Sequence, residues 1–189
     1  MPKKRKNTKI TREQIDREIA QSRIASNRSG GFSLVGKRIV AIKYMSLEEA
    51  QAIGWDSRPA TIVLEGNSRL YVSSDEEGNE PGTLVAEDKG TSHSFYPKTR
   101  WEADENLEPK NLDRLLVSRN SLKGCWIASG HYMSGGKMGS MGWSKQAFVI
   151  KLDNGVELIP FSDEEGNEAG SWFGTDEVGD FAICARMTK

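Results

Sequence analysis

The chain has 189 residues, with 26 Lys and Arg against 27 Asp and Glu, a formal net charge of -1 and 37% hydrophobic residues. No apolar run approaches the roughly 18 residues of a membrane span and no N-terminal segment resembles a signal peptide, so we expect a cytoplasmic protein without membrane contact. Two cysteines, Cys125 and Cys184, are too few for a disulfide scaffold or a cysteine zinc site.

The near-zero net charge is the sum of a basic N-terminal segment and acidic segments that follow it. Residues 1–33 carry nine basic and three acidic residues, whereas residues 34–97 carry six and ten. Residues 98–121 carry five of each, and residues 122–189 carry six and nine. A basic arm is therefore joined to an acidic body. Such blocks of like charge commonly serve as interaction tails, and the partner of this one should be anionic: a nucleic acid, an acidic protein surface, or the acidic body itself.

The arm, residues 1–31, combines a basic cluster with a short predicted helix. Pro2–Lys6 resembles a brief nuclear localisation signal, and the protein would be nuclear if it acts as one. Thr11 with Gln14 forms a capping box that predicts a helix to about Ser26. The arm residues that we expect to contact phosphates are Lys3, Lys4, Arg5, Lys6, Lys9 and Arg12.

The strongest signal in the sequence is an internal repeat. Shifting the chain by 88 residues aligns residues 36–82 with 124–170 without a gap, and 18 of the 47 pairs are identical. Random pairing would give about three. The repeat predicts a tandem duplication, with a first β repeat at 32–97, a linker at 98–120 and a second β repeat at 121–189.

In the first repeat, β-rich residues 37–45 predict a strand. A capping box of Ser46 and Glu49 then predicts a helix over 47–53, ended by Gly54. Residues 61–65 and 69–73 read as a hairpin, and residues 92–96 as a last strand. The linker holds an apolar run, Leu112, Leu115 and Leu116, that suits a short helix.

The second repeat has the same plan with one expected difference. Residues 125–133 predict a strand, but three interior glycines predict a loop over 134–142, because each glycine costs about 1 kcal/mol in a helix. Residues 148–153 and 156–161 read as a hairpin with a type I′ turn at Asn154–Gly155, followed by a strand at 181–186. Short strands with glycine-rich turns favour a mainly β fold, a pair of small SH3-like or partly open barrels preceded by the basic helical arm.

Both repeats contain the acidic segment S-D-E-E-G-N-E, at 74–80 and 162–168. One interpretation of this segment is a solvated turn that protects a sheet edge. The others are a Ca²⁺ site and a docking loop for a basic partner. The spacing of the acidic residues does not match an EF-hand loop. The candidate ligands are Asp75, Glu76, Glu77, Asn79 and Glu80 in the first loop and Asp163, Glu164, Glu165, Asn167 and Glu168 in the second.

Four aromatic residues occupy equivalent positions in the repeats: Tyr44, Trp55, Tyr132 and Trp143. They could form a stacking platform for bases or a cage for a cation, but packing in the core is the favoured interpretation. A Cys125–His131 dyad is excluded because six residues on one strand span about 20 Å.

These observations identify no catalytic motif and predict no cofactor. We therefore expect a non-enzymatic binding or adaptor protein whose basic arm contacts nucleic acid, a nucleoprotein assembly or another anionic surface. One alternative is a protein that sequesters a small ligand or cation in the acidic loops or the cleft between the repeats. Another is a structural subunit of a homo-oligomer or larger assembly.

Overall fold

The computed structural model describes both repeated segments in part. The described residues are 33–73, 82–99, 122–141, 143, 145–161, 170–175 and 179–187. The basic arm, the linker helix predicted around Leu112 and the two acidic loops lie outside these residues.

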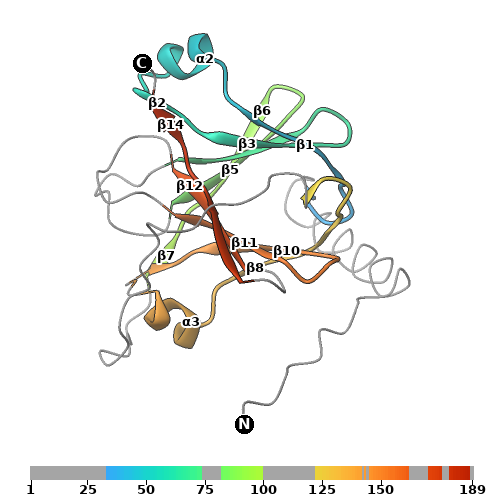
Figure 1. Ribbon diagram of the computed structural model, residues 1–189, viewed down its shortest axis with the longest axis vertical. Helices are drawn as coiled ribbons and strands as arrows, with labels where there is room; N and C mark the ends of the chain where they lie inside the picture. Colours follow the sequence, from blue (N-terminus) through green and yellow to red (C-terminus); the bar gives the residue numbers. More distant parts are fainter. Residues whose placement is uncertain are drawn as a thin grey trace.

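The first repeat forms a five-stranded antiparallel sheet with a short helix beside it (Figure 1). Consecutive long strands are neighbours, in the order β1-β3-β4-β5-β6, so the sheet is a meander. Its elements are β1 (Ile39–Tyr44), α2 (Leu47–Ala52), β2 (Ser57–Arg58), β3 (Ala60–Leu64), β4 (Arg69–Ser73), β5 (Thr83–Asp88) and β6 (Thr91–Phe95).

The second repeat forms a sheet with the equivalent strand order, β8-β10-β11-β12-β13. Its helix and its first strands begin 88 residues after their counterparts in the first sheet. The elements are β8 (Ile127–Tyr132), α3 (Gly135–Ser140), β9 (Lys145–Gln146), β10 (Phe148–Leu152), β11 (Glu157–Phe161), β12 (Ser171–Thr175) and β13 (Asp180–Ile183).

Each five-stranded sheet is followed by a two-residue strand that pairs with a strand of the other repeat. After the first sheet, β7 (Lys98–Thr99) pairs with β9, and after the second sheet, β14 (Arg186–Met187) pairs with β2. We call these two pairs the exchanged ladders. Their registers are equivalent, because Arg186 lies opposite Arg58 and Lys98 lies opposite Gln146. Figure 1 shows β2 and β14 near α2 at one end of the molecule, and β7 near α3 toward the other end.

The two sheets also join through their first strands. An antiparallel bridge pairs Arg38 with Trp126, two residues 88 apart in sequence. On either side the backbone hydrogen bonds are reciprocal: the Gly36 N–H donates to the Ile127 carbonyl and the Gly124 N–H to the Ile39 carbonyl, both at 2.8 Å. A local twofold relation between the repeats therefore passes close to the bridge.

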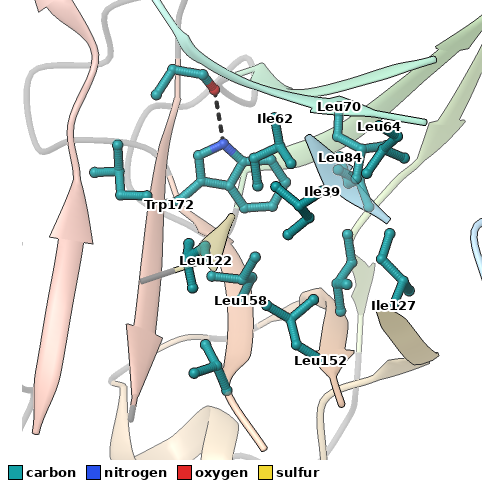
Figure 2. Close-up of a cluster of buried hydrophobic side chains, with 14 of the residues drawn as sticks. Ile39, Ile62, Leu64, Leu70, Leu84, Leu122, Ile127, Leu152, Leu158 and Trp172 are labelled. Carbon is teal, nitrogen blue, oxygen red and sulfur yellow. Dashed lines mark hydrogen bonds between the residues drawn. The ribbon is translucent and has the colours of Figure 1, made fainter. Parts of the chain in front are cut away.

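One hydrophobic core serves both sheets. It is formed by buried aliphatic residues from the two repeats together with Trp172 and Phe181, and Figure 2 labels Trp172 and several of the aliphatic residues. The Trp172 indole Nε1 donates to the Ala60 carbonyl of the first sheet at 2.8 Å, across 112 residues of sequence. Because inner-face residues of both sheets bury one another, the two repeats form a single packed body.

The prediction of a mainly β chain is confirmed, with two five-stranded antiparallel sheets and no closed barrel among the described strands. The first helix is confirmed as well. The Ser46 hydroxyl accepts from the Glu49 N–H at 3.1 Å, the Glu49 carboxylate accepts from the Ser46 N–H at 3.2 Å, and Gly54 follows with φ of 82°.

The prediction of a loop over 134–142 is wrong, because Gly135–Ser140 form helix α3. Met138 is completely buried on this helix and Met141, just after it, is nearly so, within a cluster that also contains Trp143. Burying two methionine side chains offsets the cost of three helical glycines, since each fully buried side chain stabilises by about 1.5–3 kcal/mol. Tertiary packing thus overrides local propensity here.

The type I′ turn predicted at Asn154–Gly155 is also wrong. Gly155 has φ of 88°, whereas Asn154 is not among the residues with positive φ, and a type I′ turn requires positive φ at both. The Gly155 N–H donates to the Leu152 carbonyl at 3.0 Å and the Leu152 N–H to the Val156 carbonyl at 2.8 Å. This is a three-residue loop, in which a turn is followed by a glycine in the left-handed conformation.

Candidate functional site

The strands of the exchanged ladders are short and basic. Each of their four strands carries one basic residue and no acidic residue: Arg58 on β2, Arg186 on β14, Lys98 on β7 and Lys145 on β9. The same holds for β1, β4, α3 and β10, with Lys43, Arg69, Lys137 and Lys151. What distinguishes the ladders is that they bring basic residues of the two repeats together, and Arg186 lies directly opposite Arg58.

In the β2–β14 ladder, the two arginines contact two consecutive residues, Tyr44 at the end of β1 and Met45 directly after it. The Arg186 guanidinium lies over the Tyr44 ring, 4.1 Å from its centroid. The Arg58 Nε donates to the Met45 carbonyl at 2.6 Å. Arg186 is exposed and Arg58 is half-buried. Both side chains are thus fixed against neighbouring points of the same strand end.

The β7–β9 ladder repeats this arrangement with less charge. Gln146 stands at the position of Arg58, and its Nε2 donates to the Met133 carbonyl at 2.7 Å, the equivalent of the Met45 contact. Lys98 stands opposite Gln146, as Arg186 stands opposite Arg58. The exposed side chain of Tyr96 lies two residues before Lys98. The two ladders therefore share a backbone plan but differ in their basic residues.

The tryptophans singled out from the sequence pack beside the helices. Trp143 is buried with Met133, Met138 and Phe173. Trp55 is half-buried and meets the Tyr71 ring edge-on, with centroids 6.0 Å apart. Neither forms an open stacking surface with a tyrosine of the predicted set.

The tyrosines of that set lie at the rims of the shared core. Tyr44 carries the Arg186 guanidinium, and Tyr132 meets Phe148 edge-on at 5.3 Å. Burial raises the pKa of Tyr132. Phe148 in turn stacks on Phe95 of the first repeat at 4.4 Å, so this aromatic group joins the two sheets.

An ion pair between helix and sheet occurs in both repeats with opposite polarity. In the first repeat, Glu49 on α2 accepts from the Arg69 Nη1 at 2.8 Å, and Arg69 also pairs with Glu87. In the second, Lys137 on α3 pairs with Glu157 on β11. Lys137 is the counterpart of Glu49 and Glu157 is the counterpart of Arg69, 88 residues on. The ion pair between helix and sheet is thus present in both repeats, but the acidic residue is on the helix in the first repeat and on the sheet in the second.

These pairs shift the pKa values of their groups. The hydrogen bond from Arg69 lowers the pKa of Glu49, and Ser46 adds to the effect. Burial alone would raise the pKa of Glu157, but the hydrogen bond and charge of Lys137 outweigh it, so the net shift is downward. Burial and the hydrogen bond to Glu87 raise the pKa of Tyr71, whose hydroxyl donates to that carboxylate at 2.9 Å.

Exchanging the second pair tests whether its polarity matters. We expect K137E or E157R alone to lower the free energy of unfolding by about 1 kcal/mol, and the double variant to recover most of the loss, because it recreates the polarity of the first repeat. The measurement is a double-mutant cycle by urea unfolding at neutral pH.

The same cycle has an expected pH dependence. The lowered pKa of Glu157 means that its contribution is present above the ordinary pKa of a glutamate and is lost as the pH falls through the lower folded value. The coupling should therefore be clearly smaller at about pH 3 than at neutral pH. A coupling that persists unchanged there would contradict an ionic origin.

Lys37 and Ser68 form a Ser–Lys pair in the first repeat whose role is structural and not catalytic. Lys37 Nζ donates to the Ser68 hydroxyl, which donates to an Asp88 oxygen at 2.9 Å. Ser–Lys pairs can activate a nucleophilic serine. Ser68, however, has 0% exposure, so no substrate reaches its hydroxyl. The contacts tie the start of the first repeat to the β3–β4 and β5–β6 turns.

Cys125 is not poised as a nucleophile. It precedes β8 and is half-buried, and burial together with the charge of Asp153 raises the pKa of its thiol. A raised pKa disfavours the thiolate, which is the reactive form. His131 lies exposed on β8.

Several predicted site residues cannot be placed on this framework. The six arm residues from Lys3 to Arg12 and the ten residues of the acidic loops lie outside the described residues. Within the described ranges, no group of three or more His, Cys, Asp or Glu could hold a metal ion. The same ranges contain no helix that is both long and apolar enough to cross a membrane.

Comparisons with known proteins give no relative for this chain. No protein-family model, no curated protein and no solved structure matches it. Function must therefore be argued from the residues themselves.

The exchanged ladders were missed by the sequence reasoning. In the sequence, Arg58 and Lys145 lie within three residues of Trp55 and Trp143, and Arg186 ends the strand predicted at 181–186. A two-residue strand has no periodicity to detect, and its partner lies more than 40 residues away.

Proposed function

We propose that this chain is a non-enzymatic binding or adaptor protein that contacts the phosphates of a nucleic acid, alone or within a nucleoprotein assembly. The observation that carries the proposal is the separation of charge: nine basic and three acidic residues in positions 1–33, ahead of a body with an acidic excess. Clustered lysines and arginines bind nucleic acid by neutralising phosphates and releasing counterions.

The described body supports this role as a scaffold. One core joins the two sheets, and the exchanged ladders add basic residues at two ends of the packed unit. We propose further that the body arose by tandem duplication of one SH3-like unit, opened so that each copy completes the other. The 18 identities in 47 aligned pairs support the duplication.

Removal of the arm tests the proposal. We expect deletion of residues 1–31 to weaken binding to a mixed-sequence DNA duplex by about 100-fold or more at moderate salt. If six phosphate contacts are lost, the slope of log affinity against log salt should fall by about 5. Fluorescence anisotropy over a salt series measures both quantities.

A second variant separates charge from chain length. Replacing Lys3, Lys4, Arg5, Lys6, Lys9 and Arg12 by glutamine keeps the arm but removes its expected phosphate contacts. It should behave like the deletion. Unchanged affinity and salt slope in both variants would sink the proposal.

A further inference from the structure

We propose that Arg58 and Arg186 form a phosphate-binding site on the body, distinct from the arm, which grips the backbone of the bound nucleic acid. The inference rests on the proposed function and assigns it a second site. The two arginines come from opposite repeats and meet only because β14 crosses to β2.

The two guanidinium groups occupy one face of the ladder. Residues directly opposite in an antiparallel pair have Cβ atoms about 4.5–5.5 Å apart and project to the same side, and like charges in such a pair are destabilising. Arg58 and Arg186 are such a pair. An anion bound between the two guanidinium groups would attract both of them and so offset their mutual repulsion. Arginine suits phosphate because its planar group donates two parallel hydrogen bonds.

Each arginine side chain is fixed by one contact with the protein and keeps other N–H donors for a ligand. Arg58 uses its Nε on the Met45 carbonyl, which leaves both terminal Nη groups for other contacts. Arg186 rests its face on the Tyr44 ring, and a stacked guanidinium still presents its N–H groups around its edge. Since Tyr44 and Met45 are consecutive, both groups are ordered near one point before any ligand arrives. Such preorganisation lowers the entropic cost of binding.

Neither arginine has a carboxylate partner among the described residues. Other cations in the same ranges do: Arg38 has Glu65 at 3.7 Å, Lys37 has Asp88 at 3.7 Å, Arg69 has Glu49 and Glu87, and Lys137 has Glu157. Within those same ranges, Arg58 and Arg186 have no carboxylate within salt-bridge distance. No carboxylate of the described residues therefore competes with an external anion for these two charges.

The site should read the backbone and not the bases. Base stacking needs an open aromatic face, and Arg186 covers a face of Tyr44. Phosphate contacts position a protein on nucleic acid without sequence preference. We therefore expect equal effects on duplexes of different sequence.

The second repeat supplies the design of the test. Arg58→Gln places in the first repeat the residue found at the equivalent position, where Gln146 still donates to the Met133 carbonyl. This substitution removes charge while keeping the backbone contact. Arg186→Gln removes the other charge, and Arg186→Lys, the residue type of Lys98, retains it. Gln146→Arg adds a charge to the β7–β9 ladder.

The experiment measures binding of the full chain to a short mixed-sequence DNA duplex over a salt series. We expect R58Q and R186Q each to weaken binding about fivefold to tenfold, and the double variant to lower the salt slope by about 1.8. R186K should bind more tightly than R186Q but less tightly than wild type, because lysine keeps the charge but lacks the planar group that stacks on Tyr44 and donates two parallel hydrogen bonds. Q146R should increase the affinity. The matched control is R38Q, which removes an exposed arginine that lies over Trp126 but is paired with Glu65. It should change affinity less than twofold.

The outcomes separate the site from the proposed function. If the full chain binds the duplex and deletion of the arm abolishes binding, but R58Q/R186Q binds like wild type with an unchanged thermal midpoint, the site is refuted and the function stands. If the full chain binds no duplex, both fail. If the double variant loses binding to polyglutamate but not to DNA, the site takes an acidic polypeptide and the inference is wrong. If R186K loses as much affinity as R186Q, charge is not the cause and the inference also fails.

Discussion

Replacing Trp172 by leucine should lower the free energy of unfolding by about 3 kcal/mol. Trp172 has 0% exposure in the shared core, and its counterpart in the first repeat is Leu84, so leucine is an accepted residue at the equivalent position. The substitution removes buried aromatic volume and the hydrogen bond to the Ala60 carbonyl. Urea unfolding followed by circular dichroism measures the change.

The variant W172F separates the two contributions. Phenylalanine keeps much of the apolar volume but cannot donate to Ala60, so its expected cost is about 1–2 kcal/mol, that of a buried carbonyl left with one partner fewer. A loss below about 1 kcal/mol for W172L would contradict the placement of Trp172 at the centre of the core.

A shared core also predicts how the protein unfolds. Because the buried residues of the two sheets contact one another, both repeats should unfold in one cooperative transition, and W172L should move its midpoint without splitting it. Two separate transitions in wild type would mean that the repeats are independent domains.

Replacing Gly170 by alanine should cost about 2–3 kcal/mol. A Cβ atom there would lie 2.3 Å from the Val72 Cγ1 and 2.9 Å from the Phe161 carbonyl oxygen. The backbone cannot withdraw easily, since the Gly170 N–H donates to the Val72 carbonyl at 2.9 Å. Thermal and urea unfolding measure the loss.

Gly136 provides the matched control. It lies in α3 and a Cβ added there meets nothing within 4 Å, so G136A should stabilise the protein by up to about 1 kcal/mol through helix propensity. In G170A/V72A, the loss should be smaller than the sum of the two single losses, because the closest contact, with Val72 Cγ1, is removed. An additive result would show that the contact with Val72 is not the source of strain.

Local sequence patterns predicted the elements that depend on local physics. The α2 helix has a capping box and a glycine stop, and both are present. The strand β5 was missed because Thr83 to Ala86 are all buried, so the alternation of a half-buried strand is absent. The strand β12 was missed for a related reason: Gly174 interrupts it, and the ring of Phe181 fills the space where its side chain would be.

The candidate site could not be predicted because it joins distant residues. Arg58 and Arg186 are 128 positions apart, and each belongs to a strand of two residues. The repeat made the equivalence of the two copies evident, yet it gave no sign that each copy supplies a strand to the other. The charge of the arm, in contrast, is a property of composition and was apparent at once.

The exchange of terminal strands has a consequence for biosynthesis. The ribosome makes β2 long before β14, so a nascent chain carrying only the first repeat has no partner for residues 57 and 58. The inner face of its sheet also lacks the half of the core that the second repeat provides. We therefore expect the first repeat to complete its fold only together with the second, although domains commonly fold in order of synthesis. Until translation reaches β14, the nascent chain should expose apolar surface and an unpaired strand, the features that make folding intermediates prone to aggregation.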